Sequence, residues 1–285
     1  MTTFQELTTS VHPQWCPGCG NYGILLALKQ AIAKIGVAPK DIVLVSGIGC
    51  SGKTPHYVHV YGFESIHGRT LPVATAIKLC NHKLTVIAAG GDGDAYGIGL
   101  SHFIHAMRRN IDITYVVHNN QVYGLTKGQT SPTSGKGYKS KSTPDGTLEE
   151  PINPLTLALD AGATYIARGF AGDTVHLVNL ITEGIKHKGF SLIDVFQPCL
   201  SFNTVNTFDY YKANVYKLEE TKHDVADFEA AHKKAREYEK LPIGLFYKTS
   251  KPTYGDGLPQ IAKQALVEQD ISNVDVTPLL KKKEI

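Results

Sequence analysis

The sequence lacks several features that mark whole classes of protein. It has no apolar run of about eighteen residues, the length that a helix needs to cross a bilayer, and its first residues lack the basic and then apolar pattern of a secretory signal. Charged residues make up only 19%, and 29 Lys and Arg stand against 26 Asp and Glu. We therefore expect a soluble cytoplasmic protein that binds neither membranes nor nucleic acid.

Cysteine is also scarce, with five residues in a chain of 285. Because the cytoplasm is reducing, the spacing of these residues indicates metal or redox chemistry before disulfides. An apolar content of 42% is enough for a proper hydrophobic core, and no internal repeat is evident. These features exclude a disordered, collagen-like or disulfide-stapled protein.

Short segments rich in branched apolar residues alternate with helical patterns along the first two thirds of the chain. Strands buried on both faces have this continuous apolar character, which predicts an open, mainly parallel sheet with helices on both faces, in the α/β class. Gly36 follows the first helical pattern, where a left-handed cap would end a helix. The expected strands are residues 41–47, 84–90, 111–118, 163–168 and 191–196, and the expected helices are residues 21–35, 71–80 and 98–109.

The rest of the chain is less regular. Residues 126–151 contain few large apolar side chains and predict a long mobile loop, a kind of segment that is usually functional. We expect residues 1–200 to form the α/β domain and residues 201–285 to form a C-terminal extension or arm. A short helix is expected near residues 224–239.

Polar or glycine-rich segments follow four of the expected strands. Ligands of open parallel sheets bind beyond the carboxyl ends of the strands, so we expect these segments to converge. Asp92 and Asn120 offer the hard oxygen ligands that Mg²⁺ prefers, and neighbouring glycines let the backbone approach a diphosphate. Taken alone, each motif also fits an ordinary turn or strand cap. The segments are residues 47–54, 91–94, 119–122 and 197–199.

The cysteines indicate a second cofactor. Cys16 and Cys19 lie two residues apart before the first expected helix, whose free N–H groups favour thiolates. A second pair with this spacing, which would mark a zinc site, is missing. Cys50 and Cys199 instead follow strands at the predicted ligand edge, so we predict that these four cysteines hold a [4Fe–4S] cluster. Cys80 lies on the apolar stripe of a helix and fits a buried thiol.

The spacing of the two magnesium motifs resembles the thiamine diphosphate fingerprint, with GDG at residues 91–93 and NN at residues 119–120. This resemblance implies that Asp92, Asn120 and the main-chain carbonyl of Val122 coordinate Mg²⁺. It also implies that the diphosphate is lined by Gly91, Gly93, Tyr123, Gly124, Leu125 and Thr126.

Five motifs occur in a fixed order along the chain, at residues 12–20, 47–51, 61–69, 91–94 and 119–129. Together they resemble the β subunit of 2-oxoacid:ferredoxin oxidoreductases of the archaeal two-subunit type, which act on pyruvate, 2-oxoglutarate and similar acids. The resemblance implies the thiamine diphosphate-binding fold. It also implies the coenzyme A-dependent oxidative decarboxylation of 2-oxoacids to acyl-CoA and CO₂, with electrons passing through the [4Fe–4S] cluster to ferredoxin.

The family resemblance also implies roles for residues near the cofactor. His67 and the turn formed by Gly49, Cys50 and Ser51 would approach thiamine diphosphate. Lys53 would act at the mouth of the site by pairing with a carboxylate of the substrate, although it fits a solvated loop lysine equally well.

One catalytic group is missing from this pattern. In the family, the glutamate that activates thiamine lies on a separate pyrimidine-binding domain, which implies an obligate α subunit as partner. Glu64 is the only nearby glutamate of this chain that offers an alternative.

Two other functions stay open. Residues 47–54 match the P-loop pattern of NTPases and follow a strand. A P-loop runs straight into a helix, however, and the β-branched and aromatic residues 55–62 are poor helix formers. A non-catalytic scaffold subunit that binds zinc through its cysteines is the second alternative.

Overall fold

The computed structural model describes residues 2–282, so the last three residues of the expected 201–285 segment lie outside it. A 3₁₀ helix covers Ser51–Tyr57 and a π-helical segment covers Gly93–Ile98. The helices are α1 (Asn21–Ile35), α2 (Thr70–Cys80), α3 (Leu100–Arg108), α4 (Pro154–Asp160), α5 (Thr174–Lys186), α6 (Phe208–Asn214), α7 (Phe228–Ala235) and α8 (Thr277–Lys281). The strands are β1 (Ile42–Ser46), β2 (Tyr61–Glu64), β3 (Thr85–Gly91), β4 (Thr114–Asn119), β5 (Val122–Tyr123), β6 (Gln129–Thr130), β7 (Tyr165–Phe170), β8 (Ser191–Phe196), β9 (Val215–Lys217) and β10 (Leu241–Lys248).

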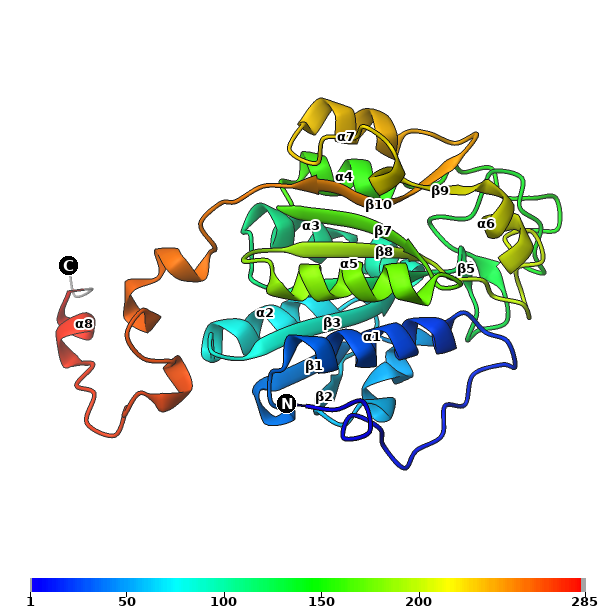
Figure 1. The fold of residues 1–285 in the computed structure, drawn as a ribbon. Helices are drawn as coiled ribbons and strands as arrows, with labels where there is room; N and C mark the ends of the chain where they lie inside the picture. Colours follow the sequence, from blue (N-terminus) through cyan, green and yellow to red (C-terminus); the bar gives the residue numbers. More distant parts are fainter. Residues whose placement is uncertain (1, 283–285) are drawn as a thin grey trace.

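Eight strands form one sheet in the order β2-β1-β3-β4-β8-β7-β10-β9. Neighbouring strands are parallel except for β7 and β10, which are antiparallel. The predicted open, mainly parallel α/β sheet is therefore confirmed. Because β1, β3, β4 and β8 are direct neighbours and parallel, the polar segments that follow them start side by side at one edge (Figure 1).

Helices cover both faces of this sheet (Figure 1). On one face α1 packs beside α5, and Leu28 and Leu177 are fully buried in their shared core. On the other face α2, α3 and α4 enclose Phe103 and Leu155. Every residue of β4 and β8 is buried, which explains why these strands read as continuous apolar runs. As expected, α1 ends at Gly36, whose φ of 72° is left-handed.

Three strands of the sheet were not predicted, because they have no clear apolar pattern. β2 lies at the edge and exposes all four of its residues, so it carries no apolar stripe. β9 has only three residues, all of them half-buried. β10 contains Pro242 and Gly244, and Gly244 has a φ of 124°. Proline and glycine ordinarily interrupt the pattern of a strand, and here β10 bulges where it pairs with β7.

Part of the chain after residue 200 still belongs to the sheet. β9 and β10 are sheet strands, and α7 corresponds to the helix expected near residues 224–239. Only the chain after Lys248 extends away as an arm that ends with α8 (Figure 1). The arm is therefore shorter than expected, because the sheet continues past residue 200.

Residues 126–151, expected as a mobile loop, are tied to the rest of the fold by hydrogen bonds. β6 pairs with β5 in a short hairpin, and the Tyr138 hydroxyl donates to the carbonyl of Phe202 at 2.6 Å. The loop therefore holds a defined position beside the ligand edge of the sheet.

No helix within residues 2–282 combines the length and the apolar character required to cross a membrane.

Candidate cofactor site

A cavity of about 160 Å³ lies beyond the carboxyl ends of β1, β3, β4 and β8. Its wall contains all thirteen residues that the sequence predicts to bind thiamine diphosphate or to line its site. Lys53 does not line this cavity. The thirteen residues are Gly49, Cys50, Ser51, His67, Gly91, Asp92, Gly93, Asn120, Val122, Tyr123, Gly124, Leu125 and Thr126.

Asp92 is a buried carboxylate, 1% exposed, directly after β3. The hydroxyls of Ser131 and Thr133 both donate to its Oδ2, Thr133 at 2.7 Å. Burial raises the pKa of Asp92 to about 6, and the two hydrogen bonds oppose this rise. Because both hydroxyls serve one oxygen, Oδ1 is left for a cation, which would offset the cost of burying the charge.

Asn120 and Val122 present further oxygen atoms at the same wall. The residue between them, Gln121, has a left-handed φ of 60°, which is uncommon for a residue with a side chain. The resulting tight turn is held by the Val122 N–H, which donates to Oδ1 of Asn120 at 3.1 Å, and by Asn203, which donates to the Asn120 carbonyl at 3.0 Å. Carboxylate, amide and carbonyl oxygens at one wall suit Mg²⁺.

Gly93, directly after Asp92, has no room for a side chain. A side chain at Gly93 would begin 2.2 Å from the ring of Tyr123, which leaves no room for even a methyl group. Gly93 therefore permits the close approach of backbone and ring at the wall of the cavity.

Asp94 organises the other side of the cavity. Its Oδ1 accepts the N–H groups of Ile48 and Gly68 at 3.1 and 2.7 Å, and its Oδ2 accepts the Thr70 hydroxyl at 3.0 Å. The Nδ1 atom of His67 lies 3.0 Å from the same Oδ1. Asp94 thus connects the turn after β1 to the segment that carries His67, and it fixes both against the cavity.

Predicted ligands of the iron–sulfur cluster and of Mg²⁺ lie next to each other around Gly124. A methyl group at this position would lie 3.7 Å from Sγ of both Cys50 and Cys199, and 3.8 Å from Nδ2 of Asn120. Two predicted cluster ligands and one predicted magnesium ligand therefore surround a single glycine.

All four predicted cluster ligands lie close enough to influence one another. Burial raises the pKa of Cys19 to about 12, and the charges of Cys199, Cys50 and Cys16 also raise it. Thiolates gathered in this way need a cationic partner, which iron supplies in an iron–sulfur cluster. Among residues 2–282, no three His, Cys, Asp or Glu side chains have the geometry of a single-ion site.

Two family models match this chain. The thiamine pyrophosphate enzyme, C-terminal TPP binding domain, matches residues 47–195, and the C-terminal model of the pyruvate ferredoxin oxidoreductase beta subunit matches residues 199–263. The 2-oxoacid:ferredoxin oxidoreductase subunit beta of Saccharolobus solfataricus is 45% identical over 95% of this chain and 96% of its own length. The chain belongs to the 2-oxoacid:ferredoxin oxidoreductase β-subunit family.

Other members support the same assignment of this β subunit. The 2-oxoglutarate synthase subunit KorB of Methanocaldococcus jannaschii is 34% identical over 88% of this chain and 93% of its own length. A solved 2-oxoglutarate:ferredoxin oxidoreductase from Magnetococcus marinus, with 2-oxoglutarate, coenzyme A and succinyl-CoA bound, matches with a TM-score of 0.92 and 38% identity. That match covers 100% of this chain and 97% of the solved one. The predicted family, fold and class of enzyme are confirmed.

The alternative functions are not favoured for this β subunit. The second half of segment 47–54 already lies in the 3₁₀ helix Ser51–Tyr57. A P-loop instead leads into an α-helix that binds phosphate at its N-terminus. Nor does the match to a thiamine enzyme family favour a zinc scaffold. Cys80 lies at the end of α2, next to the amino end of β3, and is half-buried rather than fully buried as expected.

Lys53 and Glu64 lie outside the cavity wall. The charge of Lys53 favours the thiolate of Cys50, against the effect of burial, which raises the pKa of that thiol. Glu64 is on the edge strand β2, where its Oε2 lies 2.9 Å from Nε2 of His56. The nearby glutamate of this chain is therefore engaged away from the cavity.

The site of this β subunit also has residues that the sequence motifs do not single out. His118 lines the cavity, and burial lowers its pKa to about 3, so its ring is neutral. Its Nδ1 lies 2.8 Å from Oδ1 of Asn21, whereas its Nε2 has no partner among the described residues. The only signal in the sequence is a polar residue within the apolar β4. Ser131 and Thr133, which donate to Asp92, also lie outside the motifs, whereas Asp94 and Gln197 belong to segments expected at this edge but without a predicted role.

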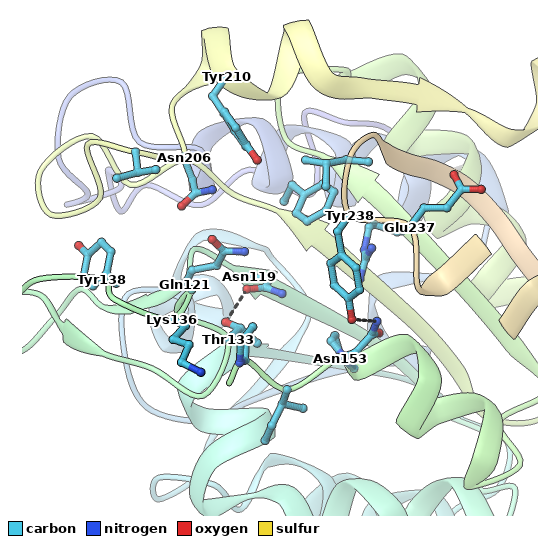
Figure 2. Close-up of a pocket in the computed structure, with 18 of the residues that line it drawn as sticks. Asn119, Gln121, Thr133, Lys136, Tyr138, Asn153, Asn206, Tyr210, Glu237 and Tyr238 are labelled. Carbon is cyan, nitrogen blue, oxygen red and sulfur yellow. Dashed lines mark hydrogen bonds between the residues drawn. The ribbon is translucent and has the colours of Figure 1, made fainter. Parts of the chain in front are cut away.

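A larger cavity of about 450 Å³ adjoins this site and is lined by Asn119 and Thr133 (Figure 2). The Thr133 hydroxyl lies 3.0 Å from Oδ1 of Asn119, in addition to its contact with Asp92. Asn119 in turn donates to the buried Asp194 at 3.1 Å. Thr133 therefore forms part of the wall between the larger cavity and the predicted metal ligand.

Proposed function

We propose that this β subunit binds thiamine diphosphate, Mg²⁺ and one [4Fe–4S] cluster. Together with an α subunit, it catalyses the coenzyme A-dependent oxidative decarboxylation of 2-oxoacids in the cytoplasm and passes the electrons to ferredoxin. The names of its relatives and the ligands of the Magnetococcus marinus enzyme support this reaction.

The observation that carries the proposal is the environment of Gly124. Cys50, Cys199 and Asn120 approach this one position so closely that a methyl group placed there would lie 3.7 to 3.8 Å from each of them. An electron acceptor held by the cysteines and a cofactor held through Asn120 would thus be immediate neighbours. Such proximity is what transfer of single electrons between the two cofactors requires.

In this proposal the residues of the cavity divide into three groups. Asp92, Asn120 and the Val122 carbonyl hold Mg²⁺, and the glycine-lined wall with residues 123–126 holds the diphosphate. Bound thiamine diphosphate supplies the nucleophile and the electron sink for loss of CO₂. The four cysteines, Cys16, Cys19, Cys50 and Cys199, hold the cluster.

His67 and Lys53 act on the substrate side in this proposal. Nδ1 of His67 faces the carboxylate of Asp94 at 3.0 Å, so the other ring nitrogen is the one available to exchange a proton in the cavity. Lys53 is placed to attract the carboxylate of the incoming 2-oxoacid, since its charge already acts on the adjacent Cys50.

The partner α subunit supplies the remaining group of the site. Glu64 is paired with His56 and does not line the cavity, so we assign the glutamate that activates thiamine to the partner. We also propose a functional division near residue 200, which the limits of the two matched family models, at residues 195 and 199, support.

The test uses the αβ complex purified without oxygen. We expect four iron and four acid-labile sulfide per β subunit, Mg²⁺-dependent binding of thiamine diphosphate by calorimetry, and reduction of a dye by 2-oxoacids only when coenzyme A is present. The isolated β subunit should show negligible turnover. A colourless complex that contains zinc instead of iron and sulfide would overturn the proposal.

A further inference from the structure

Gln197 is a buried glutamine between the predicted cluster and the cofactor cavity. It follows β8, is 1% exposed, and its N–H donates to the carbonyl of Asn119 at 3.0 Å. A methyl group at Gly20 would lie 2.9 Å from Cγ of Gln197. The Gln197 side chain is therefore packed tightly against the residue that follows Cys19, with little freedom to rotate.

The surroundings of the Gln197 amide decide which of its two ends faces Cys19. One end lies 2.8 Å from the carbonyl oxygen of Pro198 and 3.4 Å from Sγ of Cys19. A carbonyl oxygen only accepts hydrogen bonds, so this end is the NH₂ group. One of its protons serves Pro198, and the second is directed to the sulfur of Cys19.

Gln197 is the only side chain among residues 2–282 that donates a hydrogen bond to the sulfur of any of the four predicted cluster ligands. Its other end, Oε1, is buried and has no partner among these residues. Because Gln197 also lines the cofactor cavity, its amide spans the short distance between a cluster ligand and the thiamine site.

We infer that Gln197 raises the reduction potential of the [4Fe–4S] cluster by donating a hydrogen bond to the Cys19 thiolate, an inference that rests on the proposed function. On reduction the cluster gains one electron, and part of the added negative charge resides on its cysteine sulfurs. An N–H group directed at such a sulfur stabilises the reduced state more than the oxidised state. The buried, weakly polarisable surroundings of Gln197 strengthen this preference.

Gln197 is thus a positioning residue for electron transfer and takes no part in bond making. It would make the cluster a better acceptor for electrons that arrive one at a time from the thiamine site. Without the hydrogen bond, the ratio of reduced to oxidised cluster at a fixed potential should fall by about tenfold, which is about 59 mV for a one-electron couple.

The experiment compares the αβ complex that carries Gln197→Met with the wild-type complex. Methionine retains the length of the side chain but has no N–H group, so the packing against Gly20 is largely kept. Gln30→Met, at an exposed position of α1, is the matched control. The midpoint potential is measured by redox titration monitored by EPR, with iron and sulfide determined on each sample.

We expect unchanged cluster content in both variants and a more negative potential only in Gln197→Met. Equal potentials in all three complexes, each with a full cluster, would overturn the inference and leave the proposed function intact. Absence of a cluster from the wild-type complex would overturn the proposed function itself.

A measurement on the wild-type complex covers the case in which Gln197→Met fails to assemble its cluster. Glutamine is labelled with ¹⁵N in its side chain, and pulsed EPR of the reduced cluster is recorded. The inference requires a hyperfine coupling to this nitrogen, with an exchangeable proton on it. A spectrum without such a coupling overturns the inference.

Discussion

The hydroxyl of Thr133 lies 2.7 Å from Oδ2 of Asp92 and belongs to a residue 41 positions further along the chain. This contact joins the loop after β6 to the carboxylate that we propose as a magnesium ligand. The Thr133 hydroxyl has one proton to donate. The carboxylate of Asp92 is both closer and a stronger acceptor than the amide oxygen of Asn119, so the proton goes to Asp92. The loop therefore helps to keep Asp92 ionised.

We predict that Thr133→Val moves the pH dependence of cofactor binding upward. The pKa of Asp92 is raised to about 6, so affinity for Mg²⁺ and thiamine diphosphate should fall as the pH drops through that value. Removing one of the two hydrogen bonds that favour the carboxylate raises the pKa further. A hydrogen bond to a charged group contributes about 1.5 kcal/mol or more, so we expect binding to be about fourfold weaker at pH 6.5 and about tenfold weaker near pH 5, below both pKa values.

Calorimetric titrations between pH 5 and pH 8 test this prediction. The diphosphate has ionisations of its own, which are common to both proteins and cancel in the comparison. Thr143→Val, in the same loop, serves as the control, because Thr143 contacts Ser140 and not Asp92. An unchanged midpoint in Thr133→Val would show that the loop does not control the charge of Asp92.

The cysteines should separate into two classes when they are replaced. Cys16→Ser, Cys19→Ser, Cys50→Ser and Cys199→Ser should each lose the intact cluster, whereas Cys80→Ser should keep it. The reason is that the first four thiols influence one another, whereas Cys80 is the last residue of α2 and is not among the charges that act on them. Iron and sulfide content, with EPR of the reduced complex, measures this difference. A full cluster in Cys199→Ser would remove that residue from the ligand set.

Asp94→Ala should destabilise the fold and displace His67. The buried carboxylate accepts three hydrogen bonds from Ile48, Gly68 and Thr70, so its removal leaves buried donors without partners. We expect a loss of about 3 kcal/mol or more in the free energy of unfolding, seen as a lower thermal midpoint of the complex. Asp94→Asn, which keeps an acceptor oxygen, should lose less. Equal midpoints for the two variants would contradict this role.

Lys53→Met should distinguish substrates because we expect Lys53 to pair with the second carboxylate of a dicarboxylic 2-oxoacid. Such an acid, for example 2-oxoglutarate, has this second carboxylate and pyruvate lacks it. We expect KM for 2-oxoglutarate to rise about tenfold while KM for pyruvate changes little, with kcat nearly constant for both. Lys53→Arg keeps the positive charge and should retain most of the preference. A parallel rise of both KM values would contradict this and would instead point to the carboxylate that all 2-oxoacids share.

The convergence of the site was predictable because it follows from the topology of the sheet. β1, β3, β4 and β8 are consecutive in the sheet, so segments at their carboxyl ends must meet even though Gly49 and Gln197 are far apart in sequence. Parallel strands with continuous apolar runs are recognisable, and the rule that ligands bind beyond their carboxyl ends then locates the cavity.

The residues that support the predicted ligands were not predictable in the same way. Ser131 and Thr133 lie in an irregular loop whose path no periodicity determines, so their contact with Asp92 is visible only in three dimensions. β2 was missed because all of its side chains are exposed. β10 was missed because Pro242 and Gly244 interrupt its pattern, although both residues are paired with neighbouring strands in the sheet.

The position of Cys199 in the chain has a consequence for biogenesis. Three of the four thiols precede the third strand of the sheet, whereas the fourth appears only after β8 has been synthesised. A polypeptide still emerging from the ribosome therefore lacks a complete binding set for iron. Insertion of the proposed cluster would therefore follow synthesis of β8, and the newly made protein would pass through an interval in which its unoccupied sulfhydryls are vulnerable to oxygen.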